Sequence, residues 1–333
     1  MASQSSPSYL VRQLQVGGTA VVQLADVARR MEVSIAPSIG NMAYAFLVNG
    51  KNVLWFPYAG PDELRARPAL CGIPFLGPWA NRLDGDAYWV NGRQYLLNPA
   101  LQNLRRDERG KPIHGLLNFS PAWKLVSAGA GHDSAYAVSR LPFWQYPELM
   151  AQFPFAHNLT MTYRLTGGSL EVELLADNYS TEPLPVAFGF HPYFTLHDAP
   201  RDDWRLHVAA REHLLLDESL IPTGAAEPSQ VADPHLLRAA PLDDVFTGLV
   251  RESDNAARFW VAGGREKITV AYGPNYRVAI VFAPAGRDFL CFEPMSAVTN
   301  AFNLAQAGRY PELQTIPPGG QWRESFWITP SGF

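Results

Sequence analysis

Apolar and polar residues alternate with a period of two along much of this chain of 333 residues, and this pattern predicts β-strands. The alternation is clearest in residues 31–35, 159–165 and 169–174. Thr166-Gly167-Gly168 joins the last two segments and predicts a hairpin, and Asn91-Gly92 predicts another with a two-residue turn. Further strands are expected at 43–48, 53–56, 88–90, 94–97, 123–127, 135–139, 186–190, 204–209, 258–261, 267–272, 276–282, 289–292 and 324–329.

Helical periodicity is weak throughout, and short helical turns are expected only at 22–30, 147–151 and 301–306. More than about fifteen strands at short spacing imply two large packed sheets or a closed barrel, so the expected fold class is all-β. No Ser/Gly-rich linker or change of composition divides the chain. We therefore expect a single domain over residues 1–333, with residues 1–18 as a flexible N-terminal segment.

The composition supports this fold class and argues against a nucleic-acid partner. The chain has 9 Trp, 13 Tyr and 18 Phe together with 26 Gly and 28 Pro, which is typical of many strands and turns. Charged residues make up 17%, and the net charge is −4 without a basic stripe, so binding to a polyanion is not expected. The mixed-sign run 105–111 is typical of a solvated loop.

Location and redox state can also be inferred from the sequence. No apolar run approaches the ~18 residues of a membrane helix. The first residues lack a basic segment followed by an apolar one, so we expect no secretory signal, no membrane contact and a cytoplasmic protein. Cys71 and Cys291 lie in apolar contexts, and neither belongs to a CxxC pair. We expect two buried thiols and no structural zinc site.

Candidate chemistry is concentrated in stretches where titratable residues stand in an apolar or turn-rich context. Glu293 closes an apolar strand, where a carboxylate is costly to desolvate unless it is paired, so it is either an exposed strand end or a functional group. His191 stands between aromatic residues and before a proline. For His191 and His114, a hydrogen-bonded core or turn histidine is the common alternative. For Arg82 the alternative is a surface pair with a nearby aspartate, and for Asp243 a turn.

Taken together, these stretches resemble the aldose 1-epimerase (galactose mutarotase-like) family over about residues 33–329. Each motif alone is weak, but the set occurs in the family's order. The motifs are Gly-Pro-x-x-Asn-Arg at 77–82, His114-Gly115, the segment 178–185 continuing to 189–194, Ile221-Pro222-Thr223-Gly224, Asp243-x-x-Phe246 and Phe292-Glu293-Pro294.

The resemblance implies a β-supersandwich of large antiparallel sheets, in agreement with the strand count. It also implies an isomerase that interconverts the α and β anomers of a free hexose by opening and closing the ring. Ring opening removes a proton from the anomeric hydroxyl and protonates the ring oxygen, and each proton transfer contributes roughly 10²–10⁴-fold. By motif, Glu293 is the general base and His191 the general acid.

The same resemblance assigns substrate-binding groups. His114 and Arg82 hydrogen-bond near the ring oxygen, Asn81 orients the sugar, and Asp243 accepts from its hydroxyls, with Asp244 left open as the alternative. No cofactor or metal ion is needed because the reaction is redox-neutral. The expected partner is a small-molecule sugar, and we expect a monomer. Aromatic faces for the sugar are expected from Trp79, Phe190 and Tyr193.

Other functions remain open at this point. Relatives that act on hexose 6-phosphates tend to carry Arg where Asn118 stands, which favours a free sugar, although the run 105–111 offers other cations. The alternatives are a hexose-6-phosphate 1-epimerase and a catalytically silent carbohydrate-binding protein on the same fold. A weaker one is a glycoside hydrolase that pairs Glu293 with Asp243 or Asp244. The sequence does not specify the hexose.

Overall fold

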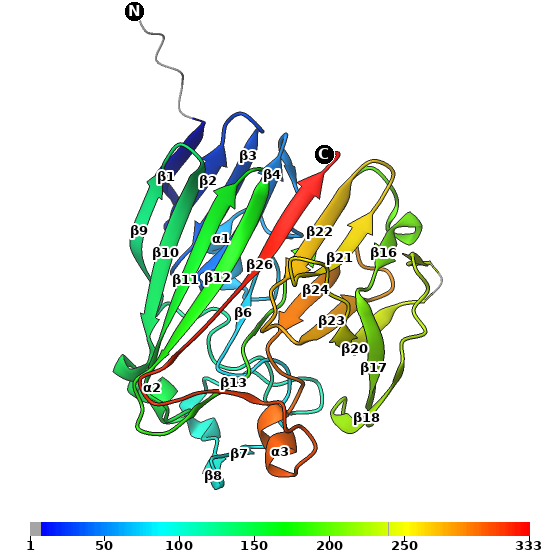
Figure 1. The fold of residues 1–333 in the computed structure, drawn as a ribbon. Helices are drawn as coiled ribbons and strands as arrows, with labels where there is room; N and C mark the ends of the chain where they lie inside the picture. Colours follow the sequence, from blue (N-terminus) through cyan, green and yellow to red (C-terminus); the bar gives the residue numbers. More distant parts are fainter. Residues whose placement is uncertain (1–7, 239) are drawn as a thin grey trace, which may run out of the picture.

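The computed structural model describes residues 8–238 and 240–333 and shows a mostly β protein made of large antiparallel sheets (Figure 1). The N-terminal part forms a five-stranded sheet in which each strand pairs with the next along the chain. Its strands are β1 (Tyr9–Val16), β2 (Thr19–Asp26), β3 (Met31–Ala36), β4 (Met42–Val48) and β5 (Lys51–Asn52).

A nine-stranded antiparallel sheet runs across the molecule in the order β19-β16-β21-β22-β26-β12-β11-β10-β9 (Figure 1). Its central strand, β26, pairs with β12 on one side and with β22 on the other, so it joins segments that are far apart in the sequence. The strands are β9 (Lys124–Ala130), β10 (Ser134–Pro142), β11 (His157–Thr166), β12 (Ser169–Asn178), β16 (Arg205–His207), β19 (His235–Leu236), β21 (Ala257–Ala262), β22 (Lys267–Tyr272) and β26 (Gln321–Ser331).

An eight-stranded sheet in the order β18-β17-β20-β23-β24-β14-β6, with β15 also paired to β24, carries the candidate site. Two small sheets pair β7 with β8 and β13 with β25. The strands are β6 (Phe75–Leu76), β7 (Ala87–Val90), β8 (Arg93–Leu96), β13 (Leu184–Val186), β14 (Gly189–Phe190), β15 (Tyr193–Phe194), β17 (Ala210–Leu216), β18 (Pro222–Pro228), β20 (Leu242–Leu249), β23 (Val278–Ala283), β24 (Leu290–Met295) and β25 (Gln314–Ile316).

Helices are short and lie in the connections. The α-helices are α1 (Pro61–Ala66), α2 (Pro147–Met150) and α3 (Ala301–Gln306), and the 3₁₀ turns are η1 (Pro99–Leu101), η2 (Phe143–Gln145) and η3 (Arg201–Asp203). None of the helices in the described part of the chain has the length and apolar content needed to cross a membrane.

The core lies between the sheets and follows the alternation of the sequence. In β12, Leu170, Val172 and Leu174 are fully buried, whereas Glu171 and Glu173 point to the other face. Strand β2 of the N-terminal sheet packs on β10 and β11 of the large sheet, and Val22 and Leu24 of β2 share one apolar cluster with buried side chains of both strands. Because a shift of one residue would expose this whole apolar face, the pairing register is strongly specified.

The predicted fold class is confirmed, and so are both predicted hairpins. The first joins β11 to β12, and the second joins β7 to β8. In the second turn Asn91 and Gly92 have φ values of 53° and 74°, the left-handed values that a two-residue turn of this type requires. The helical turns expected at 147–151 and 301–306 correspond to α2 and α3.

The helical turn expected at 22–30 is wrong, because residues 19–26 form β2. Val21, Val22 and Leu24 are buried in this strand, which pairs with β1 on one side and β3 on the other. Valine and leucine packed into a two-sided sheet outweigh a weak local helical signal.

The strand expected at 53–56 is also wrong. The side-chain oxygen of Asn52 accepts the backbone N–H of Phe46 at 2.9 Å and that of Leu54 at 3.1 Å. A side chain therefore replaces the backbone partner, and only an isolated bridge from Leu54 to Phe194 follows. The segment expected at 186–190 divides between β13 and β14, which belong to different sheets.

A flexible N-terminal segment over residues 1–18 is wrong from residue 9 onward. Strand β1 pairs with β2 along its full length. Tyr9 is buried, and its hydroxyl accepts the N–H of Gly167 at 3.0 Å, which fixes the start of the strand. The expectation for residues 1–7 lies outside the described residues.

Candidate active site

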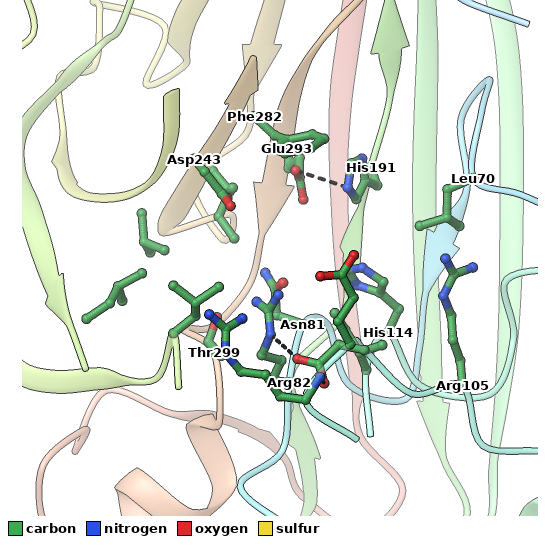
Figure 2. A pocket seen from close by; sticks show the side chains of 18 of the residues that line it. Leu70, Asn81, Arg82, Arg105, His114, His191, Asp243, Phe282, Glu293 and Thr299 are labelled. Atoms are coloured by element: carbon green, nitrogen blue, oxygen red, sulfur yellow. Dashed lines mark hydrogen bonds and ion pairs between the residues drawn. The ribbon is translucent and has the colours of Figure 1, made fainter. Parts of the chain in front are cut away.

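A cavity of about 490 Å³ lies over β20, β23 and β24 and is also lined by the loops around residues 81–82 and 105–114 (Figure 2). Pockets that bind small molecules typically measure ~300–1,000 Å³. The two catalytic candidates and the four substrate-binding candidates assigned by the resemblance all lie in the wall of this cavity: Asn81, Arg82, His114, His191, Asp243 and Glu293.

Glu293 is held in the middle of β24 and is only 2% exposed. The strand pairs with β23, where Ile280 stands opposite Glu293, so the backbone of the residue is rigid. Burial raises the pKa of Glu293 well above its ordinary value; Asp243 raises it further and Arg82 lowers it. A carboxyl group with such a pKa retains its proton at a pH where an exposed one is ionised.

His191 lies between β14 and β15 and faces Glu293 (Figure 2). Its backbone N–H donates to the oxygen of Pro74 at 3.0 Å, and its ring stacks on Tyr193 with 4.6 Å between centroids and 6° between planes. These contacts place Nε2 of His191 3.3 Å from Oε1 of Glu293. Burial lowers the pKa of His191 to about 3, and the charge of Arg105 also lowers it. These opposite shifts favour a proton on Glu293 and a neutral ring on His191.

His114 is positioned by a close approach of two backbone segments. His114 and Gly115 have φ values of 63° and 67°, and the N–H of His114 donates to the oxygen of Asn81 at 2.9 Å. A Cβ on Gly115 would lie 2.1 Å from the oxygen of Gly77, so only glycine fits there. The ring of His114 meets that of His191 edge-on, with 5.6 Å between centroids. Burial lowers the pKa of His114 well below its ordinary value, which keeps the ring neutral.

Arg82 and Asn81 enter the cavity from the segment that approaches His114. Asn81 has a φ of 56°, and Nε of Arg82 donates to Oδ2 of Asp107 at 2.7 Å. Asp107 also accepts the N–H groups of Arg109 and Lys111, both at 2.9 Å, so it fixes its own loop and the guanidinium together. The sequence does not reveal Asp107 as the partner, because its separation from Arg82 gives no local pattern.

Side chains alternate between the two faces of β20, so the neighbouring residues Asp243 and Asp244 point in opposite directions. Asp243 lines the cavity, whereas Oδ1 of Asp244 lies 2.9 Å from Nε2 of His213 outside it. Among the described residues, Asp243 has no hydrogen-bond or ion-pair partner. Burial raises its pKa, Arg82 lowers it and Asp244 raises it. The structure therefore brings Asp243, and not Asp244, to the cavity.

The mixed-sign run 105–111 is not simply a solvated loop, because it forms one wall of the cavity. Arg105 extends beside His191 and Leu70 (Figure 2), and its backbone oxygen accepts the N–H of Ile113 at 3.0 Å. Charge patterning cannot distinguish a loop that faces solvent from one that lines a cavity.

Two of the three aromatic residues expected to face the ligand belong to the core. Trp79 and Phe190 are 1% and 0% exposed, and neither reaches the cavity. Tyr193 lines it, together with Phe282, which the sequence pattern does not single out. Asn118 is buried elsewhere, where its Nδ2 donates to the backbone of Phe75 at 2.8 Å.

Within the described part of the chain, one cluster could hold a metal ion: it consists of His191, Cys291 and Glu293, whose ligand atoms lie within 4.8 Å of one another. Cys71 and Cys291 are both buried free thiols, as expected. Burial raises the pKa of Cys291 well above its ordinary value, and Glu293 raises it further. Because metal ions bind thiolate and carboxylate rather than their protonated forms, a metal ion bound here would have to displace the protons of both groups.

Comparison with solved structures identifies the class of fold to which this chain belongs. The chain superposes on a galactose mutarotase-like protein from Clostridium acetobutylicum with a TM-score of 0.86 and 17% identity, covering 98% of this chain and 99% of the other. The fold is therefore galactose mutarotase-like. The family model for aldose 1-epimerase matches residues 29–329, and the chain belongs to the aldose 1-epimerase family.

The curated relatives are also of low sequence identity. The uncharacterized protein YihR of Escherichia coli is 23% identical over 235 residues, which cover 68% of this chain and 70% of YihR. The galactose mutarotase of Rattus norvegicus is 28% identical over 156 residues, which cover 46% of this chain and 41% of the rat protein.

Proposed function

We propose that this protein is an aldose 1-epimerase, an isomerase that interconverts the α and β anomers of a free hexose. The observation that carries the proposal is the buried pair of His191 and Glu293, with Nε2 and Oε1 3.3 Å apart in the wall of a cavity of sugar size. Membership of the aldose 1-epimerase family and the partial match to rat galactose mutarotase support it.

The two residues act on the two oxygens bonded to C1 of the sugar. The carboxylate of Glu293 takes the proton of the anomeric hydroxyl, and the electron pair of that O–H bond forms the carbonyl bond between C1 and O1. The bond between C1 and the ring oxygen breaks, and the ring oxygen keeps its electron pair and receives a proton from Nε2 of His191. Rotation about the C1–C2 bond presents the other face of the aldehyde, and the reverse transfers close the ring.

The reaction starts with one proton held by the pair of His191 and Glu293. Burial places this proton on Glu293, because it favours the neutral form of both groups. Arg82 opposes this effect by lowering the pKa of Glu293. A single transfer over the 3.3 Å between the two groups then gives the ionised Glu293 and the protonated His191 that ring opening uses. One full cycle returns the proton, so the reaction consumes none.

The remaining polar groups of the cavity hold the sugar. Asp243 accepts hydroxyl protons, because its carboxylate has no protein partner among the described residues. The guanidinium of Arg82, held by Asp107 through Nε, keeps its other N–H groups for the sugar, and Asn81 and the neutral His114 add hydrogen bonds. Tyr193 and Phe282 offer apolar faces to C–H groups of the ring. The reaction changes no oxidation state, so we expect no cofactor.

The test measures exchange between the anomers at equilibrium. Exchange NMR between the two H1 signals of D-glucose and of D-galactose gives the enzymatic rate after subtraction of the spontaneous one. We expect acceleration by the wild type and a loss of roughly 10²–10⁴-fold in Glu293→Gln. Glu324→Gln is the matched control, because Glu324 is also a buried carboxyl with a raised pKa but lies on β26, outside the cavity. It should retain full activity.

Three outcomes would contradict the proposal. Acceleration confined to D-glucose 6-phosphate would replace it with the phosphate-specific alternative. Binding of hexoses without any acceleration would favour a silent carbohydrate-binding protein. Equal losses in Glu293→Gln and Glu324→Gln would indicate a folding defect instead of a role for Glu293 in the proton transfer.

A further inference from the structure

One arginine of the cavity wall has no compensating charge. Within residues 8–238 and 240–333, the guanidinium of Arg105 has neither a carboxylate nor a hydrogen-bond partner. Its neighbours in the wall differ: Arg82 is paired with Asp107 at 2.7 Å, and Arg106 with Asp86 at 2.8 Å. A guanidinium left unpaired in a cavity wall is a natural partner for an anionic group of a ligand.

The position of Arg105 is fixed by its loop. Its backbone oxygen accepts the N–H of Ile113 at 3.0 Å, and Asp107, two residues later, caps the turn. Glu108 and Arg109 on the same turn also line the cavity, and their formal charges cancel. Arg105 is exposed overall, but the surrounding cavity wall desolvates its guanidinium enough to lower its pKa, and no carboxylate raises that pKa.

The direction of the bound sugar follows from the proposed chemistry, on which this inference rests. In a pyranose the ring oxygen is bonded to C1 and to C5, and C5 carries C6. With O1 at Glu293 and the ring oxygen at His191, C5 and C6 must lie beyond His191, on the side away from Glu293. Figure 2 shows Asp243, Glu293 and His191 from left to right along the upper side of the cavity, and Arg105 further to the right and lower, near His114 and Leu70. The C6 end of the sugar therefore faces Arg105.

We propose that Arg105 is a specificity-determining residue that binds a singly charged oxyanion on C6, so that the site prefers a hexuronate to the neutral hexose. The guanidinium donates two parallel N–H bonds to the two carboxylate oxygens, a geometry that a hydroxymethyl group cannot accept. Asp243, at the opposite end, faces the hydroxyl groups next to C1.

The charge of the site favours a carboxylate over a phosphate. A phosphate dianion is usually held by several cations, whereas Arg82 and Arg106 are already paired with aspartates and the charge of Arg109 is offset by the adjacent Glu108. Asn118, which stands where relatives acting on hexose 6-phosphates tend to carry Arg, is buried and donates to the backbone of Phe75. It therefore adds no charge to the cavity.

The experiment compares several sugars as substrates of protein variants that keep or lose the guanidinium of Arg105. Anomer exchange is measured for D-glucuronate, D-glucose, D-glucose 6-phosphate and D-xylose, which lacks C6, with the wild type, Arg105→Gln and Arg105→Lys. Arg211→Gln is the matched control, because Arg211 is exposed on β17, outside the cavity, and its removal changes the net charge equally. Wild-type kcat/KM should be highest for glucuronate.

In Arg105→Gln, kcat/KM for glucuronate should fall roughly 10–100-fold, the usual value of a charged hydrogen-bonded pair. The values for glucose and xylose should change little. Arg105→Lys should recover part of the loss, since it keeps the charge but not the fork. Arg211→Gln should behave as the wild type.

The inference is overturned if Arg105→Gln lowers kcat/KM for glucose and xylose as much as for glucuronate, or if Arg211→Gln has the same effect. A wild-type preference for glucose 6-phosphate that is lost in Arg105→Gln would replace the carboxylate by a phosphate. If the wild type exchanges none of these sugars, the proposed function fails first. The dissociation constant of glucuronate, measured by calorimetry, then tests whether Arg105 binds the carboxylate. Tighter binding to the wild type than to Arg105→Gln supports this role, and equal binding refutes it.

Discussion

Replacement of Gly115 by alanine tests whether the close backbone approach beside His114 positions the site. Gly115 has a φ of 67°, and an added Cβ would lie 2.1 Å from the oxygen and 2.4 Å from the carbonyl carbon of Gly77. Gly110 has a φ of 75°, but a Cβ there would meet nothing within 4 Å. The two variants therefore share the cost of a left-handed alanine, ~1–2 kcal/mol, and differ only in the collision.

The collision has two consequences. Moving the Gly77 backbone away adds an overpacking cost of ~1–3 kcal/mol, so the free energy of unfolding should fall by about 2–5 kcal/mol in Gly115→Ala and by about 1–2 kcal/mol in Gly110→Ala. His114 is also displaced, and a shift of ~1 Å near reacting atoms can cost ~10²-fold in rate.

Urea unfolding at neutral pH measures the first effect, and anomer exchange of glucose measures the second. We expect Gly115→Ala to lose about 10²-fold in kcat/KM while Gly110→Ala retains the wild-type value. The reasoning is refuted if the two variants unfold at the same urea concentration, since they differ only in the space around Cβ.

Two further predictions concern protonation and sugar binding. The proposed pair of Glu293 and His191 is active when it holds one proton. It loses that proton above the raised pKa of Glu293, and it gains a second one only near the lowered pKa of His191, about 3. After subtraction of the spontaneous rate, kcat/KM should therefore not decline as the pH falls through 4.5, the ordinary glutamate value, and a decline centred there would contradict the assigned shifts. Asp243→Asn should raise KM for glucose roughly 10-fold, and Asp244→Asn, whose carboxylate faces His213, should leave it within about twofold; equal effects would contradict the separation of the two residues.

The sequence predicts the strands well where alternation is strong and both faces of a strand have distinct environments. In β12, the alternation of Leu170 and Val172 with Glu171 is visible in the sequence and in the burial. The prediction fails at β2, where two adjacent valines hide the period, and after Asn52, where a side chain ends the pairing. The prediction fails at such places because strand pairing there is decided by segments that lie elsewhere in the chain.

The candidate site is predicted in the same uneven way. The six candidate catalytic and polar binding residues, including Glu293 and His191, all reach one cavity, because each sits on a strand or tight turn with its own local signal. Asp107 and Arg105 are missed, since their importance depends on a contact or a direction that no spacing encodes. Trp79 is misassigned because an aromatic residue beside a site motif has the same sequence signal whether it faces the ligand or the core.

The central place of β26 has a consequence for the order of folding. Ser325 on this strand donates to Glu171, 154 positions earlier in the chain, and β26 separates β12 from β22 in the sheet. The strands made first thus present an unpaired edge until this late segment arrives, and contacts of such long range form slowly. During synthesis, the edge of β12 is therefore the surface most exposed to wrong pairing with another chain, and a chaperone that binds extended segments would act there.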